Sequence, residues 1–235
     1  MGARGVAIGA TALVLVAIGA VAVDRVAAGA ARDVAEREIV TSFDGVAGEP
    51  KVAIGGFPFL TQLVAGKLKD VTGRVDGLTF DGVEVTGVEL DAEGVTTSEP
   101  YTVDHAVLTG TLSVETLQEL LATKAGVDLD LGLEGDRLVA RSQLFGLDLA
   151  ATLVPRAQDG GIRADVTTVT LAGLAFDVAE LPAVLAEQLS DLAVPVDGLP
   201  AGVALTGVVV RDGGVRITAT GTDVVLPAEA LGSTP

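Results

Sequence analysis

Hydrophobic residues alternate with polar residues or glycine along most of the chain, and this period of two is typical of one face of a β-strand. In residues 127–133 every odd position is Val or Leu, while Asp128 and Asp130 fall on the opposite face, which we expect to be solvated. Strands are predicted on this basis at residues 51–54, 71–75, 78–80, 82–85, 87–91, 102–112, 127–133, 138–145, 147–154, 162–171, 203–211 and 215–225. Tight hairpin turns are indicated at 135–136, 160–161 and 213–214, so the pattern predicts antiparallel sheet with one apolar face.

Three segments instead repeat hydrophobic residues at helical spacing. In residues 24–43 one face carries Ala27, Ala31, Val34, Ala35 and Ile39, and the opposite face is charged. Because this face consists mainly of alanine, the predicted helix can lie close to a sheet. Shorter helices are predicted at 113–123, where Ser113 is a good N-cap, and at 181–189, where Pro182 stands in the first turn. The chain is therefore predicted to be α+β.

The N-terminus holds the longest uncharged stretch. Residues 6–23 are 18 consecutive residues without a charge, near the length that spans a bilayer as a helix. Either a signal peptide, cleaved after a small-residue site at 20–22 or 28–30, or an N-terminal anchor fits this segment. Both predict export, to the periplasm or the cell surface, with anchoring to the inner membrane by residues 6–23 in the second case. We expect residues 1–23 to be this segment, 24–230 a single domain, and 231–235 a tail.

Composition excludes several classes of function. The 235 residues include no Cys and one His, with a formal net charge of −17 and a hydrophobic fraction of 49%. Without Cys there is no disulfide or thiolate metal site, and one His cannot build a multi-histidine site. The acidic excess argues against a nucleic-acid partner. No metal and no cofactor are therefore expected.

Catalytic residues are hard to find in this sequence. The G-x-S-x-G motif is absent, and the one candidate base is His105. Alternation places His105 on one strand face with Val103 and Val107, and Asp104 on the other, so Asp104 does not orient the imidazole. An acidic stretch lacks the spacing of a calcium loop and is interpreted as solvated surface; it comprises Asp81, Glu84, Glu89, Asp91 and Glu93. No catalytic residue is assigned, and the residues favour a protein that is not an enzyme.

The most distinctive stretch is residues 52–69. Gly55 and Gly56 allow an unusual turn, and Pro58 stiffens the link between two phenylalanines. A short helix ending at Gly66 follows, and we expect its apolar face to be formed by Leu60, Leu63 and Val64. Two of the four lysines of the chain come next, at Lys67 and Lys69.

Two interpretations of this stretch stay open. It suits a lipid interface, with aromatic rings at acyl depth and ammonium groups at phosphate level. It equally suits a hydrophobic plug that closes one end of the core. On the first interpretation the lipid-binding residues are Phe57, Phe59, Leu60, Leu63, Val64, Lys67 and Lys69.

The run IGGFPFLTQLVAGKLKDV resembles the hallmark of the LmeA-like phospholipid-binding proteins of actinobacterial cell envelopes. The segments AEREIVTSF, VTGVELDAEGV and TGTLSVETLQELL support the resemblance, which covers most of residues 24–227. The motif residues that it carries over are Gly55, Gly56, Phe57, Pro58, Phe59, Leu60, Thr61 and Gln62.

The resemblance implies a tubular lipid-binding fold, in which a curved antiparallel sheet wraps around a long helix and encloses an apolar tunnel. It also implies an exported or membrane-anchored protein that holds the acyl chains of phospholipids and carries lipid for envelope biogenesis, so phospholipid and membrane are the expected partners. One alternative is a phospholipase or esterase, because the family has been linked to phospholipase activity. The other is a packed, non-enzymatic envelope scaffold.

Overall fold

The computed structural model describes residues 3–80, 82–125, 129–144, 147–158, 160–171, 173–177, 192–195 and 199–226. In the N-terminal helix, side chains are described from Ile18 onward. The predicted helix at 181–189 and the tail at 231–235 lie outside the described residues.

Most of the described chain forms two antiparallel sheets. The first has the strand order β1-β3-β4-β5-β13-β12, with β2 also paired to β3. Its members are β1 (Asp44–Ala47), β2 (Lys51–Ile54), β3 (Lys67–Phe80), β4 (Val83–Thr96), β5 (Thr102–Leu112), β12 (Val203–Arg211) and β13 (Gly214–Val225). The order runs from one edge strand to another, so this sheet is open.

The second sheet has the order β10-β9-β8-β7-β6, with β11 also paired to β9. Its members are β6 (Asp130–Glu134), β7 (Arg137–Leu144), β8 (Leu147–Gln158), β9 (Gly161–Leu171), β10 (Leu174–Asp177) and β11 (Leu192–Pro195). A buried cluster joins the two sheets, because Leu112, Val210 and Val215 of the first pack with Leu138 and Leu153 of the second.

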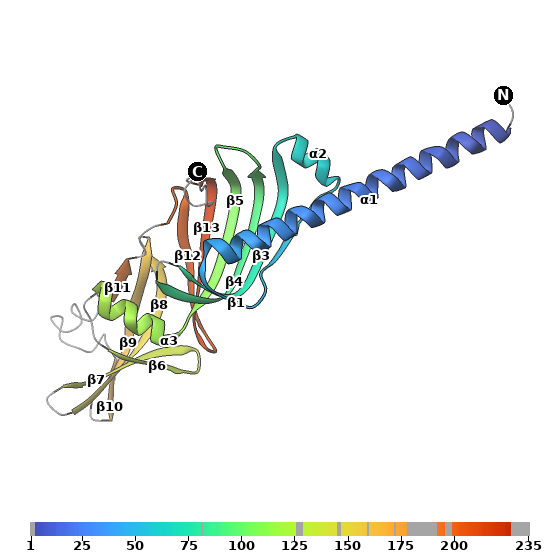
Figure 1. Cartoon of the computed structure of the whole chain (residues 1–235). Coiled ribbons are helices and arrows are strands. Elements are labelled where there is room, and N and C mark those ends of the chain that lie inside the picture. The colour runs from blue at the N-terminus through green and yellow to red at the C-terminus, as the bar shows by residue number, and fades with distance from the viewer. Residues whose placement is uncertain are drawn as a thin grey trace.

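Three helices complete the described elements: α1 (Ala3–Ser42), α2 (Phe59–Val64) and α3 (Val114–Leu120), the last continued by a π-helical turn at Leu121–Ala125. Figure 1 shows the C-terminal half of α1 lying against the first sheet, while its N-terminal part extends beyond the sheet. The contacts of α1 are with β1, β2 and α2. No helix in the part of the chain that the structure describes is both long enough and apolar enough to span a membrane.

The sequence predicted the strands well where alternation is long, and β2, β5 and β12 have the expected bounds. The four short strands predicted between residues 71 and 91 were wrong, because they are two long strands, β3 and β4. Gly77, read as a break between two strands, lies within the ladder and pairs with Thr86. Strands β1, β10 and β11 were missed.

Two smaller predictions also need correction. The last turn of the first sheet consists of Asp212 and Gly213, because Gly214 already pairs with Arg211 in the ladder. In α1, Val34 is exposed, although the helical spacing placed it on the packing face. The N-cap is confirmed: the Ser113 hydroxyl accepts a hydrogen bond of 3.1 Å from the Thr116 N–H.

Candidate functional site

One face of the first sheet is apolar across six strands. Residues directly opposite one another in an antiparallel ladder point to the same face. One row of such neighbours, from β2 to β12, consists of Val52, Gly73, Leu90, Leu108, Ala219 and Leu205. The next row on that face consists of Ile54, Val71, Ala92, Ala106, Gly221 and Val203. We call these two rows the apolar face.

The apolar face is covered over most of its area, and its accessible part lies on the middle strands β4 and β5. Val52 is only 9% exposed where α1 contacts β2, and Leu205 is buried in the cluster shared with the second sheet. Between them, Ala92 and Ala219 are buried, with Ala92 in a small cluster with Val103 and Val224. Leu90 and Ala106 are half-buried, and Leu108 keeps 42% of its surface exposed. Leu108, with the half-buried Leu90 and Ala106 beside it, forms the accessible part of this face.

The opposite face of the same strands is polar. Glu89 of β4 accepts ion pairs from Arg74, at 3.0 Å, and from Arg216, at 3.4 Å. His105 is exposed on this polar side, opposite Glu93 and Thr222 in the ladder. The acidic stretch also lies here as far as it is described, since Asp81 lies outside the described residues. Among those described, no group of acidic or histidine side chains is placed to hold a metal ion.

The GFPFLTQ motif forms a loop that is closed by Gln62. The Gln62 amide donates to the carbonyl oxygen of Gly55 at 3.1 Å, and its Oε1 accepts from the Lys69 N–H at 2.8 Å. The Gly55 N–H donates to the Asp70 carbonyl at 2.8 Å. Gln62 is therefore a buried polar side chain with partners on both sides of the loop, as such a group requires.

Gly56 is required by this closure for two independent reasons. Its φ of +80° is one that side-chain-bearing residues rarely adopt. A Cβ built at this position comes within 2.7 Å of the Gln62 amide nitrogen. The glycine and the glutamine of the motif are thus parts of one local structure.

Helix α1 holds the motif in place through a buried carboxylate. Asp24, only 3% exposed, accepts a hydrogen bond of 2.8 Å from the Leu60 N–H in the first turn of α2. Glu36, three turns further along α1, accepts from the Val52 N–H of β2 at 2.9 Å. Sequence analysis missed both roles. Asp24 lies at helical spacing from Ala28, Ala31 and Ala35, on the same face of α1. A carboxylate on this packing face was the sequence signal that could have indicated a buried hydrogen bond.

The motif exposes apolar side chains while burying polar ones. Phe59 and Gln62 point inward on α2, whereas Phe57 is 51% exposed, Val64 is 90% exposed and Leu63 is also exposed. The predicted apolar helix face of Leu60, Leu63 and Val64 is therefore not the buried face, because Gln62 is needed inside to close the loop. The plug interpretation fits Phe59, and the interface interpretation fits Phe57, Leu63 and Val64.

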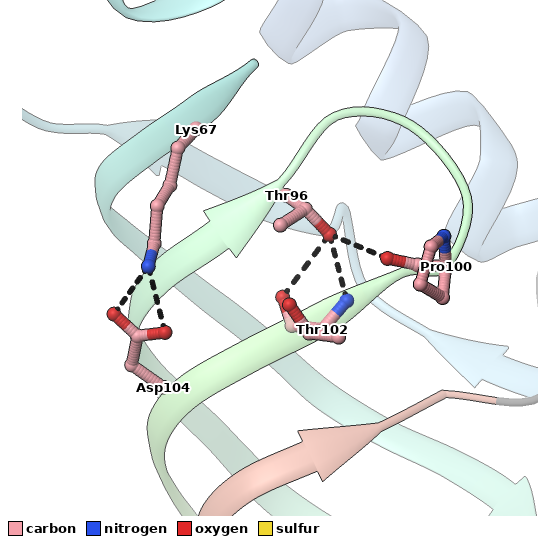
Figure 2. Close-up of polar contacts among 5 residues, drawn as sticks. All are labelled: Lys67, Thr96, Pro100, Thr102 and Asp104. Atoms are coloured by element: carbon pink, nitrogen blue, oxygen red, sulfur yellow. Dashed lines mark hydrogen bonds and ion pairs between the residues drawn. The ribbon is translucent and has the colours of Figure 1, made fainter. Parts of the chain in front are cut away.

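The two lysines differ in their surroundings. Lys67 makes an ion pair with Asp104 of β5, with 2.6 Å between Nζ and Oδ2 (Figure 2). Lys69 is exposed, and no ion pair of its ammonium group is found among the described residues. Figure 2 also shows the neighbouring β4–β5 turn, where Thr96 donates to the Pro100 carbonyl and accepts from the Thr102 N–H. The exposed motif residues and the lysines thus meet at one end of the first sheet.

Two surface hollows of about 250 Å³ lie in the described part of the chain, and neither is formed by the apolar face. One is lined by Glu115, Gln118, Glu119 and Ala122, and the other by Glu49, Lys51, Arg74 and Asp76. The expected apolar tunnel is not among them. The accessible part of the apolar face is a surface patch around Leu108.

An open antiparallel sheet with one half-covered apolar face, beside a loop that exposes aromatic and aliphatic side chains next to cations, defines a lipid-binding protein. The chain matches the model of the LmeA-like phospholipid-binding family over residues 22–220, and it belongs to that family. The resemblance noted in the sequence is thereby confirmed, and membership supports phospholipid as the ligand. Comparisons with curated proteins and with solved structures returned no match.

Proposed function

We propose that the protein binds a phospholipid by laying its acyl chains along the apolar face, beside α1. The observation that carries this proposal is the accessible part of that face, where Leu108 is 42% exposed and Leu90 and Ala106 are half-buried. Each methylene removed from water contributes about 0.8 kcal/mol, so part of one acyl chain supplies substantial affinity.

The small residues in the second row of the apolar face favour this use. Ala92 and Ala106 stand opposite each other in its centre, next to Gly221. The half-buried Ala106 leaves the sheet surface low beside Leu108, while Ala92 and Gly221 are already covered. A flexible hydrocarbon chain can contact such a surface along its length.

The family and the uncharged segment at residues 6–23 support an exported protein of the cell envelope that carries phospholipid there. Most side chains of that segment lie outside the described ones. We propose no hydrolytic activity, since His105 lies across the sheet from the apolar face.

The experiment uses one matched pair of variants. Leu108→Glu places a charge on the apolar face, while Val209→Glu changes a residue of similar exposure, 45%, on the polar face next to Arg216. Lipid extracted from purified wild-type protein is identified by mass spectrometry, and uptake of a fluorescent short-chain phosphatidylcholine is measured. Leu108→Glu is expected to lower uptake by about tenfold or more, a change of about 1.4 kcal/mol. Val209→Glu is expected to bind as the wild type does. Equal uptake by both variants, or wild-type protein without lipid and without uptake, contradicts the proposal.

A further inference from the structure

We propose that the end of the first sheet formed by α2 and the motif docks on the surface of a bilayer that contains anionic phospholipid. The inference rests on the proposed function and names the partner from which the protein takes its lipid. The docking surface consists of Phe57, Leu63 and Val64, flanked by Arg25, Lys67 and Lys69.

The first argument is the inversion of polarity at this end. The motif buries Gln62 and Asp24, which are polar, and exposes Phe57 and Val64, which are not. The closure of the loop by Gln62 explains the buried groups but gives no reason for an exposed valine and phenylalanine. Apolar side chains held outward by a fixed backbone are suited to the acyl boundary of a bilayer.

The second argument is charge. The chain has only 15 basic residues against 32 acidic ones, yet three basic residues gather beside the motif. The Arg25 guanidinium lies over the Phe57 ring, 5.2 Å from its centroid. Lys69 is free of ion pairs among the described residues, and Lys67 is paired with exposed Asp104. In a chain of net charge −17, a group of three basic residues beside exposed apolar side chains suits anionic headgroups.

The third argument is continuity with the N-terminal part of α1. The contact between Asp24 and the Leu60 N–H fixes the motif at the level where the uncharged segment of the helix ends. Directly before Asp24, the aliphatic side chains of Ile18, Val21 and Val23 are exposed. The apolar surface of α1 and that of the motif therefore adjoin at Asp24, and one bilayer surface can receive both.

The proposal is tested with tryptophan as a depth probe, because the chain contains none. Phe57→Trp places the single tryptophan on the docking surface. Phe80→Trp is the matched control, since Phe80 is 54% exposed and stands at the other end of β3. Each full-length variant is mixed with vesicles of phosphatidylcholine and phosphatidylglycerol in equal parts, with or without brominated acyl chains. Brominated chains are expected to quench the tryptophan at position 57 at least about twofold more than that at position 80, because the ring enters the acyl boundary.

A second pair of variants tests the charge. In the Phe57→Trp protein, Lys69→Glu is expected to reduce quenching by these vesicles about twofold or more, and Lys51→Glu, an exposed lysine of β2, to leave it unchanged. Equal quenching at positions 57 and 80, whether strong or weak, overturns the docking proposal. So does equal quenching of the two glutamate variants.

Uptake of monomeric short-chain phosphatidylcholine separates this result from the proposed function. If the Phe57→Trp protein takes up the monomeric lipid but brominated chains quench it no more than Phe80→Trp, lipid binding stands and docking at this surface is wrong. If the wild-type protein takes up no monomeric lipid, the result counts against the proposed function instead.

Discussion

The two ends of the first sheet share the same alternation of apolar and polar residues, but they bury their apolar side chains to different extents. At one end Leu112, Val210 and Val215 are fully covered by the second sheet, and we call this the closed end. At the other, which we call the open end, Leu90, Ala92, Ala106 and Leu108 continue the same sheet face. Ala92 is buried there in a smaller cluster with Val103 and Val224. There Leu108 is 42% exposed, whereas Val215 at the closed end is 1% exposed.

The comparison separates apolar residues that stabilise the fold from apolar residues that are available to a ligand. Both sets look alike in a list of hydrophobic positions, since the strands β4, β5 and β13 run through both ends. What differs is the covering element. The closed end has a second sheet to pack against, and the open end has α1 along its margin.

The largest effect is expected from truncating a leucine that covers the closed end. Leu153→Ala removes a side chain that is 2% exposed and leaves a cavity, so it is expected to lower the free energy of unfolding by about 2–5 kcal/mol. Leu108→Ala at the open end is expected to cost less than about 1 kcal/mol, because water already reaches that side chain. Urea denaturation of both variants measures the decrease in the free energy of unfolding. Equal decreases would mean that the open end is covered in solution.

A pair of glycines gives a smaller contrast. A Cβ built on Gly110, at the closed end, lies 2.5 Å from Cγ1 of Val85, and Val85 is held in one rotamer by its branched side chain. Gly110→Ala is therefore expected to cost about 1–3 kcal/mol through overpacking. A Cβ on Gly73, at the open end, has Leu90 Cβ as its nearest atom, at the ordinary distance of 3.7 Å. The Gly73→Ala variant should have a thermal unfolding midpoint near that of the wild type. A large decrease in this midpoint would contradict the conclusion that the open end has space for the added methyl group.

The next smaller effect on stability is expected from a substitution of Asp24, at the open end. Asp24→Ala removes the acceptor for the Leu60 N–H and is expected to cost about 0.5–2 kcal/mol, the usual value of a helix N-cap. Asp24→Asn keeps an acceptor oxygen and should recover most of the loss, while Asp33→Ala on the exposed side of α1 should change little. Hydrogen exchange of the Leu60 amide reports on the contact directly, and unchanged protection in Asp24→Ala would exclude it.

The smallest effect belongs to Glu115, in the first turn of α3 beside the closed end. Hydrogen bonds from its own backbone N–H and from the Ser113 hydroxyl lower the pKa of its carboxyl. A lowered pKa stabilises the folded state above the ordinary pKa of the group, and this contribution is lost as the pH falls through the folded value. An NMR titration should show a pKa below the ordinary one, and Ser113→Ala should raise it; the same pKa in both proteins would exclude the Ser113 contact.

The candidate site was predicted in part. Its location at residues 55–69 came from the sequence, because two glycines, a proline and two phenylalanines stand close together there. The roles of the individual residues within the site did not come from the sequence. Gln62 was a motif position without a role, and its two backbone partners, at Gly55 and Lys69, are only brought together by the fold. Asp24 was taken as the boundary of the uncharged segment, since its partner Leu60 lies 36 residues further along the chain.

The sequence by itself determined the long alternating strands, the helix over residues 24–42 and the family, because alternation, helical spacing and the GFPFLTQ motif are local properties of the chain. Only the tertiary structure decided the strand pairing. Register places Leu90 beside Leu108 and Ala92 beside Ala106, and no local pattern contains that information. Burial likewise depends on which element covers a face, so Leu108 and Leu153 differ although both are leucines in alternating strands.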